Sequence, residues 1–404
     1  MFFQDQIKEA CCGCGACSQV CAKHAITMQP DDHGFAYPSV DPELCVNCGM
    51  CEAVCPVIRK EEPSGFETRF FAVRSREEDV VRNSSSGGMF TLMAEEIFTR
   101  GGVVYGVAYG EGFRVEHERA ETMQQARAFR TSKYVQSDMA DLYEAVKRDL
   151  AENRTVLVTG TPCQIAGLKG VLAKSRMDTS KLYTCDNVCH GVSSPMVFAD
   201  YLACLQKYVP AGDRIASVNM RYKGETGDKT VFRAETENHG PILEAADFSY
   251  HKIYQTRLVT RPSCFACTFT SYNRAGDISI GDFWNCKNGD FDFDTSHGVN
   301  EVLVSTEKGM ELFRAVCEKA YWQEVSREKA WQPHLEYATQ KPKTYDAFWS
   351  DYLTGDQEMV MRNYLKSSPM AKIIHAVMPI LRKTGLYTFC GRLYKSVFVR
   401  KKKA

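Results

Sequence analysis

The chain has 404 residues, of which 44% are hydrophobic, and its 50 basic side chains balance its 50 acidic ones. Without a low-complexity tract or repeat, this composition predicts a globular protein of two or three domains. The first ten residues contain no apolar signal segment, so the 18 cysteines are not explained by a secreted disulfide framework. We therefore expect a cytoplasmic protein whose thiols bind metals or take part in catalysis.

The first predicted element is a cysteine-rich module near the N-terminus. Two runs share the spacing C-x2-C-x2-C-x3-C, namely Cys11, Cys14, Cys17, Cys21 and Cys45, Cys48, Cys51, Cys55. Bacterial ferredoxins have this spacing, and the fourth cysteine of each run binds the cluster of the other run. One 4Fe-4S cluster is therefore expected on Cys11, Cys14, Cys17 and Cys55, and the second on Cys45, Cys48, Cys51 and Cys21. The alternative, zinc, usually takes two separated pairs of cysteines.

The residues between the two runs contain apolar stretches on either side of Asp-Asp-His-Gly, which predicts a hairpin. Cys12 falls outside the spacing and is expected to be a bystander. Residues 1–62 are thus interpreted as a dicluster ferredoxin domain that passes single electrons.

The body of the chain, from about residue 68, alternates predicted strands and helices. A helix is expected after the serine-glycine loop at residues 84–88, then a strand at 103–109, a helix at 138–153, a strand at 154–160 and a helix from residue 163. Residues 214–240 are expected to form a hairpin. The alternation indicates an α/β core.

Three loops of the body have residues suited to chemistry. The SSSGG loop precedes a helix, where a phosphate is favoured, although a serine N-cap explains it equally well. The GTPCQ turn places Cys163 near a helix N-terminus, which lowers a thiol pKa, although a buried structural cysteine would look the same. The C-x-x-C pair of Cys264 and Cys267 suits zinc, redox chemistry or half of a cluster site; with Cys163 and Cys189 it supplies four thiolates for a third 4Fe-4S cluster.

These motifs carry a resemblance to a known family. SSSGG, SKYVQS (132–137), GTPCQIAGLKG, VCHGVSSP and CFAC with the following GDISIGDFW resemble the family of coenzyme F420 hydrogenase/dehydrogenase beta subunits, in the form fused to an N-terminal dicluster ferredoxin. The resemblance extends from the first cysteine to about residue 285. It implies an α/β (α+β) flavin and iron-sulfur domain over residues 68–300, with FAD, or FMN as the alternative, beside a 4Fe-4S cluster.

The resemblance also implies roles for individual residues. The third cluster would be held by Cys163, Cys189, Cys264 and Cys267, with Cys185 and Cys286 as substitutes. The flavin would be held by Ser85, Ser86, Gly87, Gly88, Lys133, Tyr134, Gln136, Ser137, Gly160, Thr161 and Gln164. Lys133 and His190 would be catalytic, Lys133 by pairing with a phosphate or a reduced flavin and His190 by donating a proton. Their alternatives are a solvated lysine and a structural histidine. Asp277 and Asp282 could belong to the site, but a role as turn residues explains them equally well.

The C-terminal region matches no motif. Residues 301–358 are expected to be a helical extension, and residues 359–404 form a basic tail without one acidic side chain. Aromatic residues interleaved with basic ones suit peripheral contact with an anionic membrane, while the alternative is a helical cap with a solvated end. Binding of nucleic acid is not expected, because no recognition fold accompanies the charge.

Two functions are compatible with these features. The first is a flavin-dependent oxidoreductase that moves electrons between a ferredoxin or another redox protein and a hydride donor or acceptor, either coenzyme F420 or a small organic molecule. The second is a non-catalytic electron-transfer subunit of a larger redox complex. The presence of both a ferredoxin domain and the family's flavin motifs in one chain favours the first.

Overall fold

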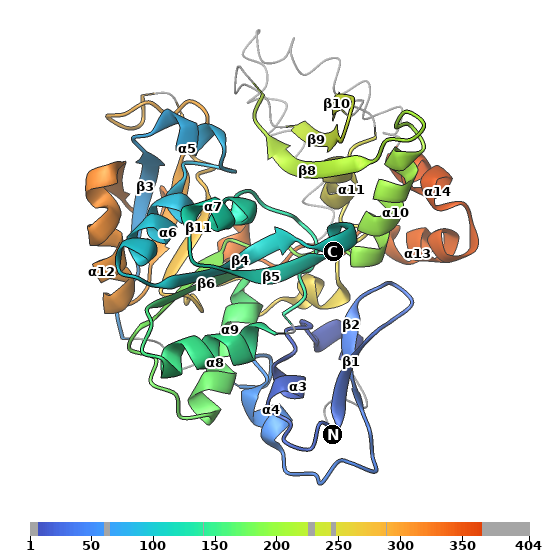
Figure 1. Cartoon of the computed structure of the whole chain (residues 1–404), viewed down its shortest axis with the longest axis horizontal. Coiled ribbons are helices and arrows are strands. Elements are labelled where there is room, and N and C mark those ends of the chain that lie inside the picture. Colours follow the sequence, from blue (N-terminus) through green and yellow to red (C-terminus); the bar gives the residue numbers. More distant parts are fainter. Residues whose placement is uncertain are drawn as a thin grey trace, which may run out of the picture.

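The structure is a computed structural model that describes residues 7–59, 65–139, 141–224, 231–243, 248–287 and 289–365. Figure 1 shows three parts: a small N-terminal domain in dark blue, a large sheet flanked by helices, and a lobe around β8, β9 and β10. Most of the expected basic tail, residues 366–404, lies outside the described residues. None of the described helices is both long and apolar enough to cross a membrane.

The N-terminal domain is built around the expected hairpin. Its elements are α2 (Ile7–Ala10), α3 (Ala16–Gln19), β1 (Ile26–Pro30), β2 (Ala36–Val40) and α4 (Met50–Val54). β1 and β2 pair antiparallel, and the Asp31 carboxylate closes the turn by accepting hydrogen bonds from the His33 and Phe35 amides. Gly15 (φ 76°) and Gly49 (φ 72°) precede α3 and α4 in the left-handed region, which glycine adopts without strain. Each short cysteine-bearing helix therefore starts at a glycine.

An eight-stranded mixed sheet forms the centre of the body. Its strands lie in the order β13 (Ala320–Val325), β3 (Arg69–Ser75), β12 (Asn300–Val304), β11 (Ile278–Asp282), β7 (Leu182–Asn187), β6 (Val156–Gly160), β4 (Val103–Tyr109) and β5 (Val115–Ala120). The four strands β11, β7, β6 and β4 are parallel, while their neighbours on both sides are antiparallel. The predicted mixed α/β core is confirmed.

Helices cover both faces of this sheet. One apolar cluster joins it to α6 (Met89–Thr99), α7 (Met123–Ala126) and α12 (Glu307–Val316). A second cluster joins the other face to α8 (Leu142–Ala151) and α9 (Pro162–Lys174), as Figure 1 shows. The remaining short helices of this part are α5 (Glu78–Arg82), η1 (Glu111–Phe113), η2 (Arg127–Phe129), η3 (Pro262–Ala266), η4 (Cys317–Lys319) and η5 (Pro333–Leu335).

The lobe contains the second expected hairpin. β8 (Ile215–Tyr222), β9 (Val231–Thr236) and β10 (Gly240–Leu243) form an antiparallel sheet, and the expected turn at 225–230 lies outside the described residues. This sheet shares an aromatic core with α10 (Pro195–Gln206), α11 (Tyr250–Gln255), α13 (Tyr345–Thr354) and α14 (Gln357–Leu365). Phe35 and Tyr37 of the N-terminal domain belong to the same core.

The helical extension expected at residues 301–358 needs correction. β12 and β13 both lie in the eight-stranded sheet, so residues 301–325 complete the body, and the helices of this region begin again at Tyr345. β13 is an edge strand whose middle side chains are exposed, so its sequence lacks the apolar alternation of a half-buried strand. Within the expected extension, the α-helical parts are therefore residues 307–316, residues 345–354 and the start of α14.

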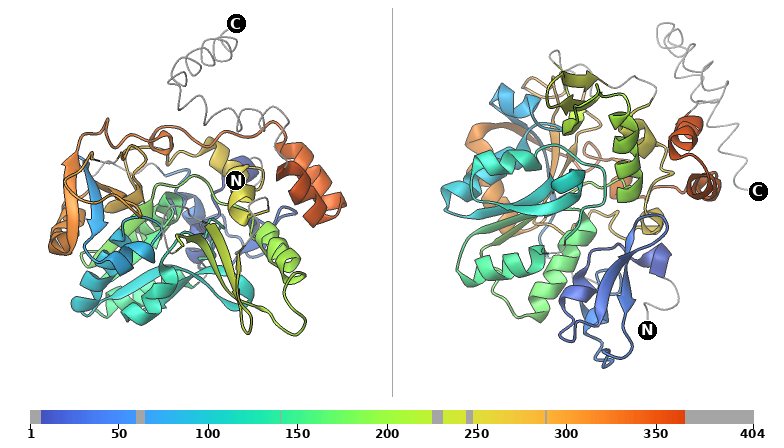
Figure 2. Two further views of the ribbon diagram at one scale, coloured as in Figure 1. Left: turned by 90° about the horizontal axis from the view of Figure 1, so that it is seen from above. Right: turned by 45° about the vertical axis from the view of Figure 1, so that its right-hand side comes forward.

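The N-terminal domain is held firmly against α9 and the lobe, as the views in Figure 2 show. Two glycines of α9 permit the close approach: a Cβ atom on Gly167 would lie 2.9 Å from the Cys14 Sγ, and one on Gly170 would lie 2.7 Å from the Val54 carbonyl oxygen. The Tyr143 hydroxyl donates to the Cys14 carbonyl over 2.5 Å. His33 stacks on Trp349 with ring centroids 3.9 Å apart. The cysteine-rich domain is thus a fixed part of the molecule.

Candidate metal centre

The two cysteine runs of the N-terminal domain lie close together. Burial raises the pKa of Cys17 to about 12, and the neighbouring thiols of Cys11 and Cys55 add to that shift. Cys21 and Cys51 both pack against a small apolar cluster formed by Cys17 and Ile26. Cys55 therefore lies near members of the first run, while Cys21 contacts a cluster that contains Cys17 of its own run as well as Cys51 of the other. The assignment of each ligand remains a prediction.

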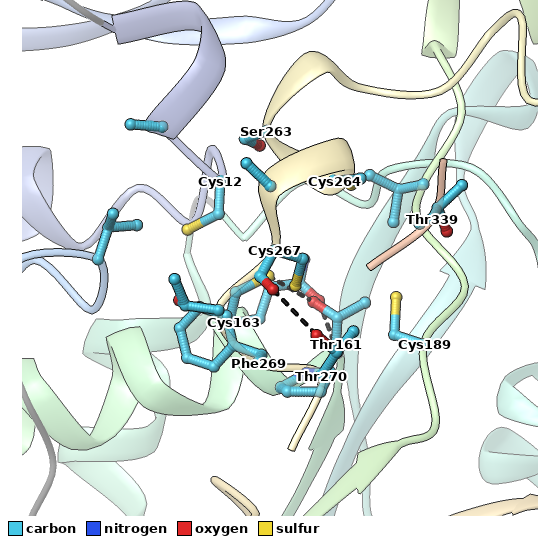
Figure 3. A pocket seen from close by; sticks show the side chains of 18 of the residues that line it. Cys12, Thr161, Cys163, Cys189, Ser263, Cys264, Cys267, Phe269, Thr270 and Thr339 are labelled. Carbon is cyan, nitrogen blue, oxygen red and sulfur yellow. Dashed lines mark hydrogen bonds between the residues drawn. The ribbon is translucent and has the colours of Figure 1, made fainter. Parts of the chain in front are cut away.

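A second gathering of thiols lines a cavity of about 220 Å³ inside the body. Figure 3 shows the four cysteines expected for a third cluster around it. Cys163 lies in the first turn of α9, Cys189 follows β7, Cys264 lies in η3, and Cys267 follows η3 directly. Chain segments that are distant in sequence thus deliver their thiols to one place.

The electrostatics of this cavity reflect crowded thiols that are shielded from solvent. Burial holds the pKa of Cys189 well above its ordinary value, and the nearby thiols of Cys264, Cys163 and Cys267 raise it further. Burial likewise raises the pKa of Cys264 to about 12 and that of Cys267 to about 11. Several thiolates in one such space would repel one another, so these thiols are neutral unless a bound cationic group stabilises their ionised form.

The cavity suits a compact inorganic group better than a dinucleotide. Its volume is below the roughly 300–1,000 Å³ of pockets that hold drug-sized organic ligands. Among the described residues, no three cysteine, histidine or acidic side chains converge at the spacing of a single metal ion. A cube of four irons separates its thiolates more widely than one ion does. Four thiols around one cavity are compatible with the expected third 4Fe-4S cluster, which stays a prediction.

The turn before α9 is held by its own side chains. The Thr161 amide donates to the Gln164 Oε1 over 3.0 Å, and the Thr161 hydroxyl lies 3.2 Å from the Cys163 sulfur. Gln164 Nε2 donates to the Ser137 hydroxyl over 2.9 Å. These bonds fix Cys163 at the helix N-terminus. The lowered pKa expected there is not found, because contact with the Cys12 thiol and burial hold the pKa of Cys163 well above its ordinary value.

Cys12, expected to be a bystander, also lines the cavity. It is half-buried, and its thiol is in hydrogen-bond contact with the thiols of Cys14 and Cys163. The contact with Cys14 is the largest cause that raises the pKa of Cys12, and burial raises it further. Cys12 thus lies between a predicted ligand of the first cluster and one of the cavity cysteines, and its expected role as a bystander stays a prediction.

The two substitute ligands lie elsewhere. Cys185 is on β7 within the apolar cluster beneath α6, and its thiol donates to the Asp186 carbonyl over 3.7 Å. Cys286 packs against Phe283 and Phe291 in a separate apolar cluster. Neither residue lines the cavity, so the geometry favours the original four cysteines.

The structure divides the residues expected to hold a flavin. Gln136, Thr161 and Gln164 line the cysteine cavity, with Gly160 and Ser137 next to them in sequence. Ser85 instead lies beside the start of the SKYVQS segment, where its hydroxyl accepts from the Ser132 amide over 2.9 Å. The SKYVQS segment therefore runs from the serine-glycine loop to the cysteine cavity.

Much of the serine-glycine loop has a structural role. Ser86 donates to the Val299 carbonyl over 2.6 Å, and a Cβ on Gly87 would lie 2.4 Å from the Val73 carbonyl oxygen. Gly88 has φ 93° and begins α6. Ser85 is thus the member of the predicted set that is best placed to meet a ligand.

Basic groups that the sequence analysis missed surround Tyr134. Arg221 on β8 donates to the Tyr134 hydroxyl over 3.0 Å and to Asp282 over 2.6 Å. His251 and Tyr254 pack against the Tyr134 ring, and Arg257 lies over Tyr254. Within the described part of the chain, the buried Arg221 Nε, Arg257 Nη1 and His251 Nδ1 have no hydrogen-bond partner. Unpartnered buried nitrogens of this kind suit an anionic ligand.

The two residues expected to be catalytic have different surroundings from those anticipated. Lys133 is buried rather than solvated, its ammonium donates to the carbonyls of Ala128, Arg130 and Thr131, and burial lowers its pKa to about 7. His190 stacks on His334 with ring centroids 4.0 Å apart, and burial lowers its pKa to about 3. Neither catalytic role is tested by this geometry.

Asp277 and Asp282 are also placed. Asp277 accepts hydrogen bonds from the Thr184 amide and hydroxyl and from the Thr306 hydroxyl, which suits the turn role. Asp282 pairs with Arg221, as described above.

Comparison with known proteins gives matches for both parts. Residues 153–329 match the family described as the C terminus of the coenzyme F420 hydrogenase/dehydrogenase beta subunit, and residues 10–58 match the 4Fe-4S dicluster domain. One subunit of the F(420)H(2) dehydrogenase of Methanosarcina mazei is 22% identical over 82% of this chain and 96% of its own. The F420-reducing NiFe hydrogenase complex from Methanosarcina barkeri contains a chain that is 16% identical, with 74% of this chain and 94% of that chain covered and a TM-score of 0.45.

Proposed function

Because residues 153–329 belong to the family of coenzyme F420 hydrogenase/dehydrogenase beta subunits and residues 10–58 form a 4Fe-4S dicluster domain, we propose that this protein is the iron-sulfur electron-transfer subunit of a complex that oxidises or reduces coenzyme F420. The relative from Methanosarcina mazei is itself named as a subunit of an F420H2 dehydrogenase. A partner redox protein, such as a ferredoxin, is then required at one end of the electron path.

The succession of thiol sites carries this proposal. Cys48 is exposed and the other cysteines of its run are half-buried, whereas Cys14 and Cys17 of the first run are buried. The Cys11 run lies against α9, whose Gly167 is close to the Cys14 sulfur and whose first turn holds Cys163. Three sites therefore follow one another from the surface into the body. When loaded with 4Fe-4S clusters, they would pass single electrons along this line.

A flavin is the finer part of the proposal. We place it between the serine-glycine loop, Tyr134 and β8, beyond the cysteine cavity. The unpartnered nitrogens of Arg221, Arg257 and His251 support this position, because they offer hydrogen bonds to phosphate or to a ring oxygen. Bound there, the flavin would supply the exchange between a hydride and single electrons. The residues of this chain would bind and orient it, and the Tyr134 and Tyr254 rings would limit access of water.

The first test is the cofactor content of protein purified without oxygen. About twelve irons per chain are expected, four for each of three clusters, together with about one released flavin. Reduced coenzyme F420 should then bleach the cluster absorbance, whereas the same protein with clusters removed should consume no more of it than the bound flavin can accept. About eight irons would contradict the third cluster, and twelve irons without flavin would contradict only the flavin site.

A pair of variants tests the flavin position. Arg257→Gln removes a cation whose buried Nη1 has no hydrogen-bond partner among the described residues, and we expect it to lower flavin retention about tenfold or more, since a charge-assisted hydrogen bond contributes roughly 1.5–3 kcal/mol. Arg148→Gln, an exposed change on α8, is the control and should retain flavin. Equal flavin content in the two variants would place the flavin elsewhere.

A further inference from the structure

Arg261 is the largest fully buried side chain of the body, and it lies between the N-terminal domain and the cysteine cavity. Its Nε donates to the Cys11 carbonyl over 2.8 Å, its Nη1 to the Gln136 Oε1 over 2.8 Å, and its Nη2 to the Ala36 carbonyl over 3.0 Å. It directly precedes η3, which holds Cys264. One guanidinium thus touches the first cysteine run and the segment that delivers a thiol to the cavity.

The charge of Arg261 has no carboxylate partner among the described residues, because all three hydrogen-bond acceptors are neutral oxygens. Its other neighbours are the faces of Tyr37 and Phe35, at 4.2 Å and 5.4 Å. Arg274, which is equally deep, is instead paired with Asp186 over 2.6 Å. An unpaired buried cation is costly, so the fold must supply negative charge to Arg261 in another form.

Predicted cluster ligands lie on both sides of this residue. The Cys264 amide donates to the Arg261 carbonyl over 3.0 Å, and Gln136, which accepts from the Arg261 Nη1, lines the cavity together with Cys163 and Cys264. On the opposite side, Arg261 holds the backbone of Cys11, a predicted ligand of the first cluster. A 4Fe-4S cluster bound by four thiolates is an anion, and reduction makes it more negative.

We propose that Arg261 is a buried counterion shared by two iron-sulfur clusters, one on the Cys11 run and one in the cavity, and that it raises the reduction potentials of both. The inference rests on the proposed function, since it requires both clusters. Each added electron is stabilised by a fixed cation in a medium that screens weakly. Arg261 is a positioning and electrostatic residue, not a ligand.

Gln136 holds Arg261 in place. Its Oε1 accepts from Arg261 while its Nε2 donates to the Cys12 carbonyl over 3.1 Å, so the amide fixes the guanidinium against the cysteine loop. Gly13 leaves room for both: a Cβ there would lie 2.5 Å from the Gln136 Nε2 and 2.8 Å from the Arg261 Nη1. We therefore assign Gln136, which was expected to contact a flavin, to the support of Arg261.

The test is a redox titration of the anaerobic holoprotein, followed by electron paramagnetic resonance of each cluster. Arg261→Gln deletes the cation, and Gln136→Glu keeps it but places a carboxylate against it. Both variants should lower two of the three midpoint potentials by about a tenfold change in the one-electron equilibrium, ~59 mV. The third potential, of the cluster on Cys45, Cys48, Cys51 and Cys21, should not move. Arg261→Lys should retain most of the wild-type values.

Arg314→Gln, an exposed change on α12, is the matched control and should leave all three potentials unchanged. Iron is counted in every sample. Twelve irons in Gln136→Glu with unaltered potentials would overturn the counterion inference while the proposed function stands. A wild-type protein with eight irons would instead overturn the third cluster of the proposed function. If Arg261→Gln does not fold, Gln136→Glu and Arg261→Lys still give opposite expectations.

Discussion

The N-terminal domain takes its eight predicted cluster ligands from two runs of eleven residues each, whereas the cavity of the body collects its thiols from segments around residues 12, 163, 189 and 264–267. In the first case, local spacing and two glycine-led turns place the sulfur atoms. In the second case, no two of the four segments are neighbours in sequence, so the sheet must form before the thiols meet. Cluster binding should therefore depend on the overall fold in the body far more than in the N-terminal domain.

The strongest test of this difference removes one ligand at a time. Cys163→Ser should abolish the cavity cluster and reduce iron from about twelve to about eight per chain, because a cube needs all four thiolates. The two signals of the N-terminal clusters should remain, and iron analysis with electron paramagnetic resonance measures both. Cys286→Ala, which changes a cysteine outside the cavity, should keep all the iron. Loss of iron in Cys286→Ala alone would reverse the ligand assignment.

The same approach tests the crossed arrangement. Cys11→Ser and Cys55→Ser should perturb one and the same cluster signal, while Cys21→Ser should perturb the other. The reason is that the spacing of each run assigns its fourth cysteine to the cluster of the other run, and Cys55 does lie near Cys11 and Cys17. If Cys11→Ser and Cys21→Ser alter the same signal, each run holds its own cluster.

A bulkier residue at the junction should separate the two regions mechanically. In Gly170→Val, the new side chain would press on the Val54 carbonyl, and overpacking of this kind costs about 1–3 kcal/mol. We expect a melting temperature lower by several degrees and slower reduction of the cavity cluster from the N-terminal side. Ala173→Val, which introduces the same residue on an exposed part of α9, is the control. Equal effects of the two changes would show that helix propensity, and not the junction, is responsible.

The stability of the body should also depend on pH, because it contains a buried carboxyl group on β12. Glu301 is 1% exposed, its only described partner is the Gln332 amide, and burial raises its pKa to about 8 from an ordinary 4.5. The folded protein therefore loses stability relative to the unfolded chain as pH rises from about 4.5 to about 8. Glu301→Gln should remove this loss.

Melting temperatures measured between pH 5 and pH 9 would check this expectation. The gain of Glu301→Gln over the wild type should grow up to about pH 8 and then level off. Glu324→Gln is the control: Arg69 lowers the pKa of this exposed carboxyl, so its contribution should be constant over the same range. A gain for Glu301→Gln that does not vary with pH would show that packing, not ionisation, is changed.

The smallest effect is expected at Cys12. Cys12→Ala should leave iron at about twelve per chain, because four thiolates remain, but it should shift the cavity-cluster signal slightly by removing a hydrogen bond to Cys163. Cys317→Ala, on the far side of the sheet, serves as the control. Loss of four irons in Cys12→Ala would make Cys12 a ligand.

Features that depend on near neighbours in sequence could be predicted. The cysteine spacing identified both ferredoxin runs, and the turn residues identified the hairpin of β1 and β2. β13 was not predicted, because an edge strand with exposed side chains lacks the alternation that identifies a half-buried strand. The helical extension expected at residues 301–358 therefore wrongly included this strand.

The roles of residues whose contacts lie far away in the sequence could not be predicted. Arg261 lies 250 positions from Cys11, and nothing in its own sequence neighbourhood reports that contact. Arg221 is likewise held by hydrogen bonds to Tyr134 and Asp282, which are distant from it in sequence. The sequence did not show that the Lys133 ammonium donates hydrogen bonds to three carbonyl oxygens of its own loop. The four cavity cysteines were found through the resemblance to a family, because the motifs of a family identify residues that meet in the fold even when they are distant in sequence.

The helix α9 limits which insertions and deletions this protein can tolerate. Its first turn holds Cys163, and Gly167 and Gly170 meet the N-terminal domain on the following turns. With about 3.6 residues per turn, one residue inserted between Cys163 and Gly167 would rotate the two glycines by roughly 100° and turn a bulky neighbour toward Val54. Length changes should therefore accumulate in the loops of homologous chains and be absent from these few positions, where the helix sets the separation of two predicted metal sites.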